Sequence, residues 1–271
     1  YANHIPTIKA AGLAYEEYPF IDYKTMTLDE SAMFNALEKL GENDVVLLHG
    51  SCHNPSGLRL TLQHWQQLAQ LAKSNNFLPL IDTAYQGFAD GLNEDAAGLL
   101  TIANTVERLA LCVSCSKNFG LYSDRVGAAY ILSPTQAEAD KAQSQLAIMS
   151  KATYWVPPSN GAEIVKTIIK DPALKNIWSE ELAQINVKIK SIRTKLCAAF
   201  RQHSGDNYFD YILFQEGMFA MLPASPEQME QLREQYAIYG LNNGRINLAS
   251  IPEHKIEYLV KSILAVTHRT K

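Results

Sequence analysis

A lysine follows closely on an apolar run and has small hydroxyl residues on its N-terminal side. Lys117 comes after residues 109–113, and Ser114 and Ser116 stand between that run and the lysine. A short continuous apolar run predicts a buried strand, and an ammonium group at the end of such a strand is costly to remove from water. A lysine in this place can attack a carbonyl or hold a phosphate. The spacing therefore predicts a chemically active lysine.

The residues around Lys117 suit a phosphate. The hydroxyls of Ser114 and Ser116 can donate to phosphate oxygens, and the planar guanidinium of Arg125 can bind two oxygens at once. This combination fits pyridoxal phosphate, whose aldehyde condenses with a lysine amine as a Schiff base. An S-x-S-K pattern alone also occurs at an ordinary surface lysine after an edge strand, so other motifs must decide.

Two further motifs follow apolar runs. Asn54 comes after residues 45–49 and can donate to a phenolic oxygen. Asp82 closes the run at 78–82, where an ionised carboxylate can keep a proton on a pyridine nitrogen and make the ring an electron sink. Tyr85 can donate to a ring hydroxyl. The plainer interpretations are an N-P-x-G turn for Asn54 and a helix cap for Asp82.

The first half alternates short apolar runs with amphipathic segments. We expect strands at residues 12–18, 45–49, 78–82, 109–113 and 127–132, and helices at 28–40, capped by Thr27, and at 61–74. Such alternation predicts an α/β domain with a mainly parallel sheet flanked by helices. Ligands in such sheets bind at the carboxyl ends of the strands, and Asn54, Asp82 and Lys117 are expected there.

The second half has a different pattern. Residues 172–200 carry apolar residues at helical spacing, which predicts one long helix of the kind that joins domains. An apolar run at 211–214, a helix at 226–236, a strand at 246–248 and a helix at 253–266 follow. We predict a large domain over residues 1–180. Residues 181–271 are predicted to form the interdomain helix and a small α+β domain.

Composition excludes several classes of function. The 271 residues include 47% apolar and 19% charged residues, and the formal net charge is −4, which gives no electrostatic case for nucleic acid or an anionic membrane. No apolar run is long enough to span a bilayer and no signal peptide opens the sequence, so we expect a cytoplasmic protein.

The cysteines stand at positions 52, 112, 115 and 197. Cys112 and Cys115 form a C-x-x-C pair, but we place both in a buried strand and find no second ligand pair at metal spacing. The prediction is therefore reduced thiols and no metal site.

The motifs together resemble one family. N-P-x-G at 54–57, D-x-A-Y-x-G-F at 82–88 and S-x-S-K-N-F-G-L-Y-x-x-R-V-G at 114–127 occur in this order. They resemble the aspartate and aromatic aminotransferases, which are pyridoxal phosphate enzymes of fold type I, and the resemblance extends from Tyr1 to Asn247. It implies a homodimer that transfers an amino group between an aromatic amino acid or aspartate and 2-oxoglutarate.

The resemblance implies roles for residues around the cofactor ring. Lys117 would form the Schiff base and then shuttle the substrate proton. Asp82 would pair with the pyridinium nitrogen, with His4 supporting it from behind. Asn54 and Tyr85 would hydrogen-bond the ring oxygen and lower the pKa of the Schiff base.

Other positions carry roles by the same resemblance. Tyr1 stands where the family usually has a tryptophan stacked on the ring, and Ser114, Ser116 and Arg125 would bind the phosphate. Arg245 would bind the substrate α-carboxylate, with Phe219 as an aromatic wall beside it.

Two departures concern substrate choice. Lys151 stands where the family has an arginine for the distal carboxylate, and lysine keeps the charge but loses the two-point fork. Trp155 and Val156 replace smaller polar residues near the subunit interface. These changes favour an aromatic substrate.

A third departure is that the given sequence lacks the part that corresponds to the family's N-terminal third. In the family that part supplies a phosphate-cradling turn, a tyrosine for the partner subunit's phosphate and further strands, so we expect an upstream portion. Two alternatives stay open: a fold-type-I lyase or decarboxylase, and a truncated fragment without cofactor or activity.

Overall fold

The computed structural model describes residues 1–268 and divides the chain into two compact units. One unit contains Tyr1–Lys39, Cys52–Arg59 and the chain from Val187 onward, and the other contains Leu40–Ser51 and Leu60–Asn186. We call them the terminal unit and the sheet unit and describe each by itself. The expected domain division after residue 180 stays a prediction.

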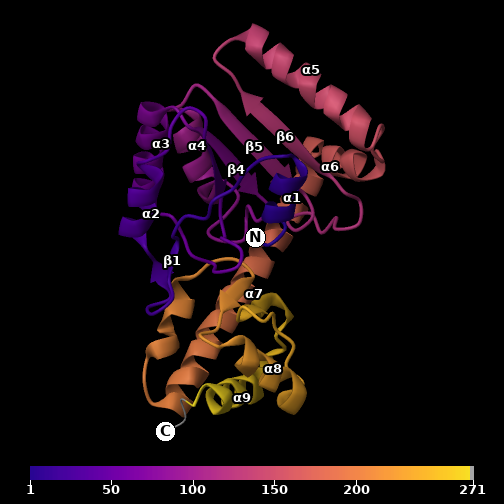
Figure 1. Cartoon of the computed structure of the whole chain (residues 1–271). Helices are drawn as coiled ribbons and strands as arrows, with labels where there is room; N and C mark the ends of the chain where they lie inside the picture. Colours follow the sequence, from indigo (N-terminus) through magenta and orange to yellow (C-terminus); the bar gives the residue numbers. More distant parts are fainter. Residues whose placement is uncertain (269–271) are drawn as a thin grey trace. The chain divides into compact units, whose positions relative to one another are not determined.

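The sheet unit is built on a four-stranded sheet (Figure 1). Its strands are β3 (Val45–His49), β4 (Leu78–Thr83), β5 (Leu109–Ser114) and β6 (Gly127–Leu132), in that order across the sheet. The first three are parallel, and β6 is antiparallel to β5. The predicted α/β class with a mainly parallel sheet is confirmed.

The strand register sets the positions of the chemically active residues. His49 of β3 lies opposite Asp82 of β4, and Asp82 lies opposite Cys112 of β5. Since parallel strands end at the same edge, Asp82 and the turn that follows β5 reach the same edge of the sheet.

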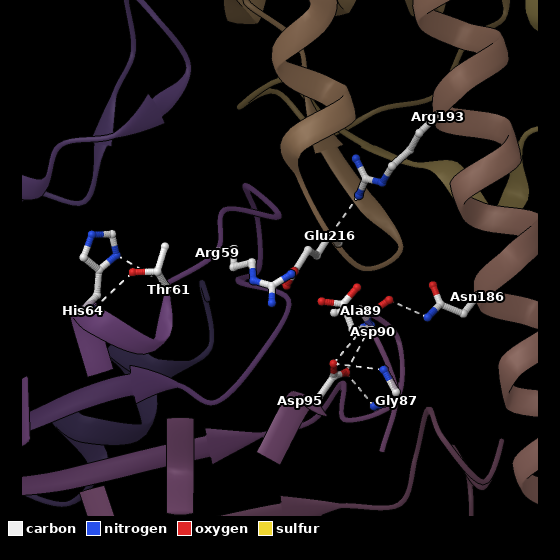
Figure 2. Close-up of polar contacts among 11 residues, drawn as sticks. Arg59, Thr61, His64, Gly87, Ala89, Asp90, Asp95, Asn186, Arg193 and Glu216 are labelled. Carbon is white, nitrogen blue, oxygen red and sulfur yellow. Dashed lines mark hydrogen bonds and ion pairs between the residues drawn. The ribbon is translucent and has the colours of Figure 1, made fainter. Parts of the chain in front are cut away.

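Helix α3 (Leu62–Asn75) is fixed at its start by a capping box. The Thr61 hydroxyl accepts from the His64 backbone N–H at 3.2 Å, and the His64 ring accepts from the Thr61 N–H at 3.1 Å (Figure 2). The helix buries Trp65, Leu68, Ala69 and Ala72 on one face. The short helix α4 (Ala97–Ala103) packs against α3, with Gly98 against the indole of Trp65.

The remaining helices of the sheet unit follow the core strands. They are η1 (Glu94–Ala96), α5 (Gln136–Thr153), α6 (Asn160–Lys170) and the first part of α7 (Pro172–Ser204). Helix α5 lies along β6 (Figure 1). The long helix expected at residues 172–200 is confirmed, and it extends to Ser204.

The terminal unit is a mixture of short helices and strand pairs. Its elements are α1 (His4–Ala10), β1 (Ile21–Asp22), β2 (Thr27–Leu28), α2 (Glu30–Leu37), the end of α7, η2 (Tyr208–Phe214), β7 (Phe219–Met221), α8 (Pro226–Tyr236), β8 (Arg245–Asn247), η3 (Leu248–Ser250), η4 (Glu253–Lys255) and α9 (Ile256–Thr267). β1 pairs with β2 and β7 with β8, both antiparallel. Phe200 and Phe209 stack at 3.8 Å in its core.

Three local expectations are wrong. Residues 12–18 form no strand and are mostly exposed, because a segment becomes a strand only where a neighbouring strand pairs with its backbone. Helix α2 begins at Glu30 rather than residue 28, since the carboxylate of Asp29, not Thr27, caps it by accepting from the Ala32 N–H at 3.1 Å.

The third concerns the C-x-x-C pair: Cys112 is exposed and Cys115 is half-buried beyond the end of β5. Both are free thiols, as predicted, and the described residues contain no cluster that could hold a metal ion. Among residues 1–268, no helix combines the length and apolar character that crossing a membrane requires.

Gly98→Ala should destabilise the protein, although alanine is the better helix former by about 1 kcal/mol. A Cβ at this position would lie 2.3 Å from the indole of Trp65. We expect the free energy of unfolding to fall by about 1–3 kcal/mol, measured by denaturant titration. In a Trp65→Leu background the same substitution should cost nothing further; an equal loss there would show that the indole is not the cause.

Candidate active site

The lysine that the sequence predicts to be chemically active lies in the turn between β5 and β6. Lys117 is half-buried, and its Nζ lies 4.9 Å from the centre of the Tyr85 ring. The base of the turn is closed by a 3.1 Å hydrogen bond from the Cys115 N–H to the Val126 carbonyl. Because Arg125 directly precedes Val126, this closure keeps both cationic side chains in one short loop.

The surroundings of Lys117 lower the pKa of its amine. Partial burial lowers the pKa of Lys117, and the positive charge of Arg125 lowers it further. The carboxylate of Asp82 acts in the opposite direction and raises it, with the net result below the ordinary value. Asp82 and Lys117 are therefore within electrostatic reach of each other, as their predicted shared role requires.

The expected phosphate-binding residues lie along the same loop. Ser116 is buried, and its N–H donates to the Ser114 hydroxyl at 3.2 Å. Arg125 is exposed with a left-handed backbone, and its Nη1 donates to the Tyr122 carbonyl at 2.9 Å. The loop thus places two hydroxyls and a guanidinium on the chain beside Lys117.

The loop that carries Tyr85 is held by a buried carboxylate. Asp95 accepts backbone N–H bonds from Gly87 (2.8 Å), Ala89 (3.1 Å), Asp90 (2.9 Å) and Gly91 (3.4 Å), most of which Figure 2 shows. The Ala89 carbonyl accepts from Asn186 of α7 at 2.6 Å. These bonds fix the path of the chain after Asp82 and hold Tyr85 near the lysine.

A second set of contacts fixes the chain just after Lys117. Asn118 donates to the Gln86 carbonyl at 3.4 Å, while the indole N–H of Trp178 donates to the Asn118 carbonyl at 2.7 Å. Phe119 stacks on Trp178 with ring centres 4.3 Å apart. The lysine turn is therefore joined both to the Tyr85 loop and to α7.

The terminal unit holds a second group of expected site residues. Arg245 begins β8, and its Nη1 donates to the Asn54 side-chain carbonyl at 2.6 Å. The guanidinium of Arg245 lies over the ring of Phe219, 4.3 Å from the ring centre. Arg245 thus contacts two other residues expected at its site, although 191 positions separate it from Asn54.

Other expected residues lie near α1 and around the end of α5. Tyr1 is exposed and meets the ring of His4 edge-on at 5.2 Å. Lys151 is exposed in the last turn of α5, and Trp155 is 71% exposed with a left-handed backbone. The proposed roles of all these site residues stay predictions.

Comparison with known proteins identifies the family of this chain. The model of the family "Aminotransferase class I and II" matches residues 1–263. The chain belongs to the class I and II aminotransferases.

Individual members of this family are similar in sequence to the chain. The chain is 40% identical over 264 residues to an aspartate aminotransferase of Escherichia coli (strain K12), and 38% identical over 264 residues to an aromatic-amino-acid aminotransferase of Paracoccus denitrificans. Each alignment covers 97% of this chain and 67% of the relative. The chain thus spans about two thirds of the length of these aminotransferases.

A solved structure shows the same fold. An aromatic-amino-acid aminotransferase from Burkholderia pseudomallei, covalently bound to pyridoxal phosphate, superposes with a TM-score of 0.93 at 32% identity. The match covers 98% of this chain and 67% of that aminotransferase.

Sequence reasoning missed the residues that hold the aminotransferase site residues in place. Asp95 and Trp178 support the sheet unit through the bonds above. In the terminal unit, Arg193 donates to backbone carbonyls, including that of Gly217. The only sequence signal for Asp95 is a carboxylate after the turn-rich stretch 91–93. Trp178 and Arg193 carry no signal beyond their places on a long helix, because their partners are backbone groups far along the chain.

The lowered pKa of Lys117 gives a pH prediction. Asp82→Asn removes the charge that raises this pKa, so the amine should become reactive at lower pH than in the wild type. Arg125→Met removes a charge that lowers it, so reactivity should need higher pH. Labelling of Lys117 by an amine reagent at a series of pH values, read by mass spectrometry, measures both shifts.

Glu163→Gln is the matched control, since it removes the same charge as Asp82→Asn from an exposed pair with Lys166 on α6. Its Lys117 profile should match the wild type. Equal shifts in the Asp82 and Glu163 variants would show that only net charge matters and that Asp82 does not act on Lys117 locally.

Proposed function

We propose that the protein is a pyridoxal-phosphate-dependent aminotransferase that moves an amino group between an aromatic amino acid or aspartate and 2-oxoglutarate. The observation that carries the proposal is the setting of Lys117, whose amine lies 4.9 Å from the Tyr85 ring and within electrostatic reach of Asp82 and Arg125. An amine, a phenol, a carboxylate and a guanidinium in one place form the set that such a reaction uses.

The residues fit pyridoxal phosphate. The cofactor is an aldehyde-bearing pyridine with a phosphate, and when bound it supplies an electron sink for the charge left on the substrate α-carbon. The lysine turn offers an amine with a lowered pKa and, on the same loop, Ser114, Ser116 and Arg125 for an anion. Asp82 offers an acid at the end of a neighbouring strand.

Each residue of the sheet unit has a separate role in this proposal. The Lys117 amine, kept neutral more easily by its surroundings, takes a proton from the substrate α-carbon and returns one to the product. The ionised Asp82 holds a proton on the ring nitrogen. The Tyr85 hydroxyl donates to the ring oxygen, and the Asp95 bonds to Gly87 and Ala89 keep Tyr85 in place.

The terminal unit offers a carboxylate site. The planar fork of Arg245 matches an α-carboxylate, and Asn54 and Phe219 orient it. Because the Asn54 side-chain oxygen accepts from Arg245, its NH₂ group is the donor end of the amide. The proposed contact of Asn54 with a ring oxygen would use this donor end.

The test is spectroscopic and kinetic. The protein mixed with pyridoxal phosphate should develop a visible absorbance band and form glutamate from 2-oxoglutarate and phenylalanine or aspartate. Lys117→Ala should abolish both, because the neutral amine is the nucleophile and the proton carrier. Lys166→Ala, which removes an exposed lysine paired with Glu163, should change neither.

The contrary outcomes point to the alternatives. A Lys117-dependent band with carbon dioxide release and no glutamate would indicate a decarboxylase. No band in the wild type would indicate a fragment without cofactor. This alternative is considered because the chain covers 67% of the length of the relatives.

We also propose a preference for aromatic substrates, based on Lys151 and on the bulky, exposed Trp155 and Val156 that follow α5. The same proposal includes a homodimer, as the family resemblance implies, and the cytoplasmic location expected from the sequence.

Lys151→Arg tests the substrate preference. Arginine restores a two-point contact with a distal carboxylate, so kcat/KM for aspartate should rise about tenfold while that for phenylalanine stays the same. Lys166→Arg is the control for a general effect of arginine on the surface. Equal changes for both amino acids would show that Lys151 does not face the distal carboxylate.

A further inference from the structure

A buried guanidinium donates hydrogen bonds to several backbone carbonyls close to the proposed carboxylate site. Arg193, on the part of α7 in the terminal unit, is 3% exposed. Its Nη1 donates to the Ile212 carbonyl at 3.1 Å. Its Nη2 donates to the carbonyls of Glu216 (2.8 Å), Gly217 (2.7 Å) and Phe219 (2.7 Å); Figure 2 draws its contact with Glu216.

These bonds account for the burial of a cation. Burial lowers the pKa of Arg193 to about 10, so the group keeps its charge at neutral pH. A buried cation is stable only when its donors are satisfied, and here carbonyl oxygens accept from both terminal nitrogens. Loss of the fork would leave several carbonyls to find other donors, so residues 215–219 depend on it for their path.

The same segment is fastened to the chain that carries Asn54. The Glu216 N–H donates to the Gly57 carbonyl at 2.6 Å, and the Glu216 carboxylate pairs with Arg59 at 2.6 Å (Figure 2). A Cβ at Gly217 would lie 2.6 Å from the Cβ of Cys52, so the two backbones pass too closely for any other residue. Residues 52–59 and 215–219 are therefore held together by several contacts.

Both partners of Arg245 belong to these joined segments. Asn54, on the first, accepts from its guanidinium at 2.6 Å, and Phe219, on the second, lies 4.3 Å below it. The strand that carries Arg245 is tied to the second segment as well, since the Leu248 N–H donates to the Met218 carbonyl at 2.8 Å. The orientation of the Arg245 fork is thus set by two residues whose separation Arg193 fixes.

We propose that Arg193 is a positioning residue for substrate-carboxylate binding: by holding residues 216–219 it fixes Phe219 and Asn54, and through them the guanidinium plane of Arg245. This inference rests on the proposed function, because it assigns Arg245 to the substrate carboxylate. It predicts that Arg193 affects recognition of the α-carboxylate and leaves attachment of the cofactor to Lys117 unchanged.

The test uses Arg193→Lys, which keeps a positive charge but replaces the fixed fork with one rotatable ammonium group. With pyridoxal phosphate bound, the ligands are α-methylphenylalanine, which has no α-proton to lose, and its α-carboxamide. The variant should bind the carboxylate ligand about tenfold more weakly and the carboxamide with unchanged affinity, because only the carboxylate needs the aligned fork. The visible band of the cofactor should be retained.

Arg201→Lys is the matched control. Arg201 lies on the same helix, is largely exposed and pairs with Asp210, so its variant should bind both ligands like the wild type. Equal weakening of both ligands in the Arg193 variant, or none, would overturn the proposal.

Amide hydrogen exchange separates this inference from the proposed function, because it needs no cofactor. Exchange of the Glu216 and Leu248 N–H groups should be at least tenfold faster in Arg193→Lys than in the wild type or in Arg201→Lys. Unchanged exchange would refute the proposal whether or not the cofactor binds. Absence of a visible band in the wild type would refute the proposed function alone.

Discussion

The parallel pairing of β4 with β5 is the constraint on which the candidate site depends. It sets Asp82 opposite Cys112, so that the turn three residues beyond the end of β5 brings the Lys117 amine within reach of the Asp82 charge. Backbone hydrogen bonds fix that register, and a slip of one residue would turn Asp82 to the other face of the sheet. The chemistry proposed for the lysine therefore rests on a ladder of bonds that involves neither functional side chain.

Lys117 and Tyr85 lie on loops, whereas Phe219 and Arg245 begin short strands. Buried polar groups give shape to the loops that carry or adjoin these residues. Asp95 gathers four N–H groups in the sheet unit, and Arg193 gathers four carbonyls in the terminal unit. Each is a charged side chain whose burial is favourable only because irregular backbone supplies its partners. Loops fixed in this way can hold an aromatic ring or a guanidinium in one orientation without a regular ladder.

Much of the fold could be predicted from the sequence, because strands buried on both faces and strongly amphipathic helices have clear patterns. The four strands of the sheet and α8 were predicted nearly residue by residue. The strand expected at residues 12–18 did not form, because residue types can favour a strand without showing whether a neighbouring strand is there to pair. The exposed Cys112 was placed inside for the same reason, since burial depends on what covers a strand.

The sequence by itself determined the order of the motifs and the mainly parallel sheet, because residue types and short spacings encode local geometry. It also predicted that Lys117 is reactive. Family resemblance already suggested that Phe219 lies beside Arg245, and the structure agrees. Only the tertiary structure decided that Arg245 bonds to Asn54, and that Arg193 holds the backbone behind them. Those contacts join residues up to 191 positions apart, and three of the four acceptors of Arg193 belong to residues 216–219. Every residue has the same backbone carbonyl oxygen, so the pattern of side chains does not indicate which carbonyls a buried arginine will bind.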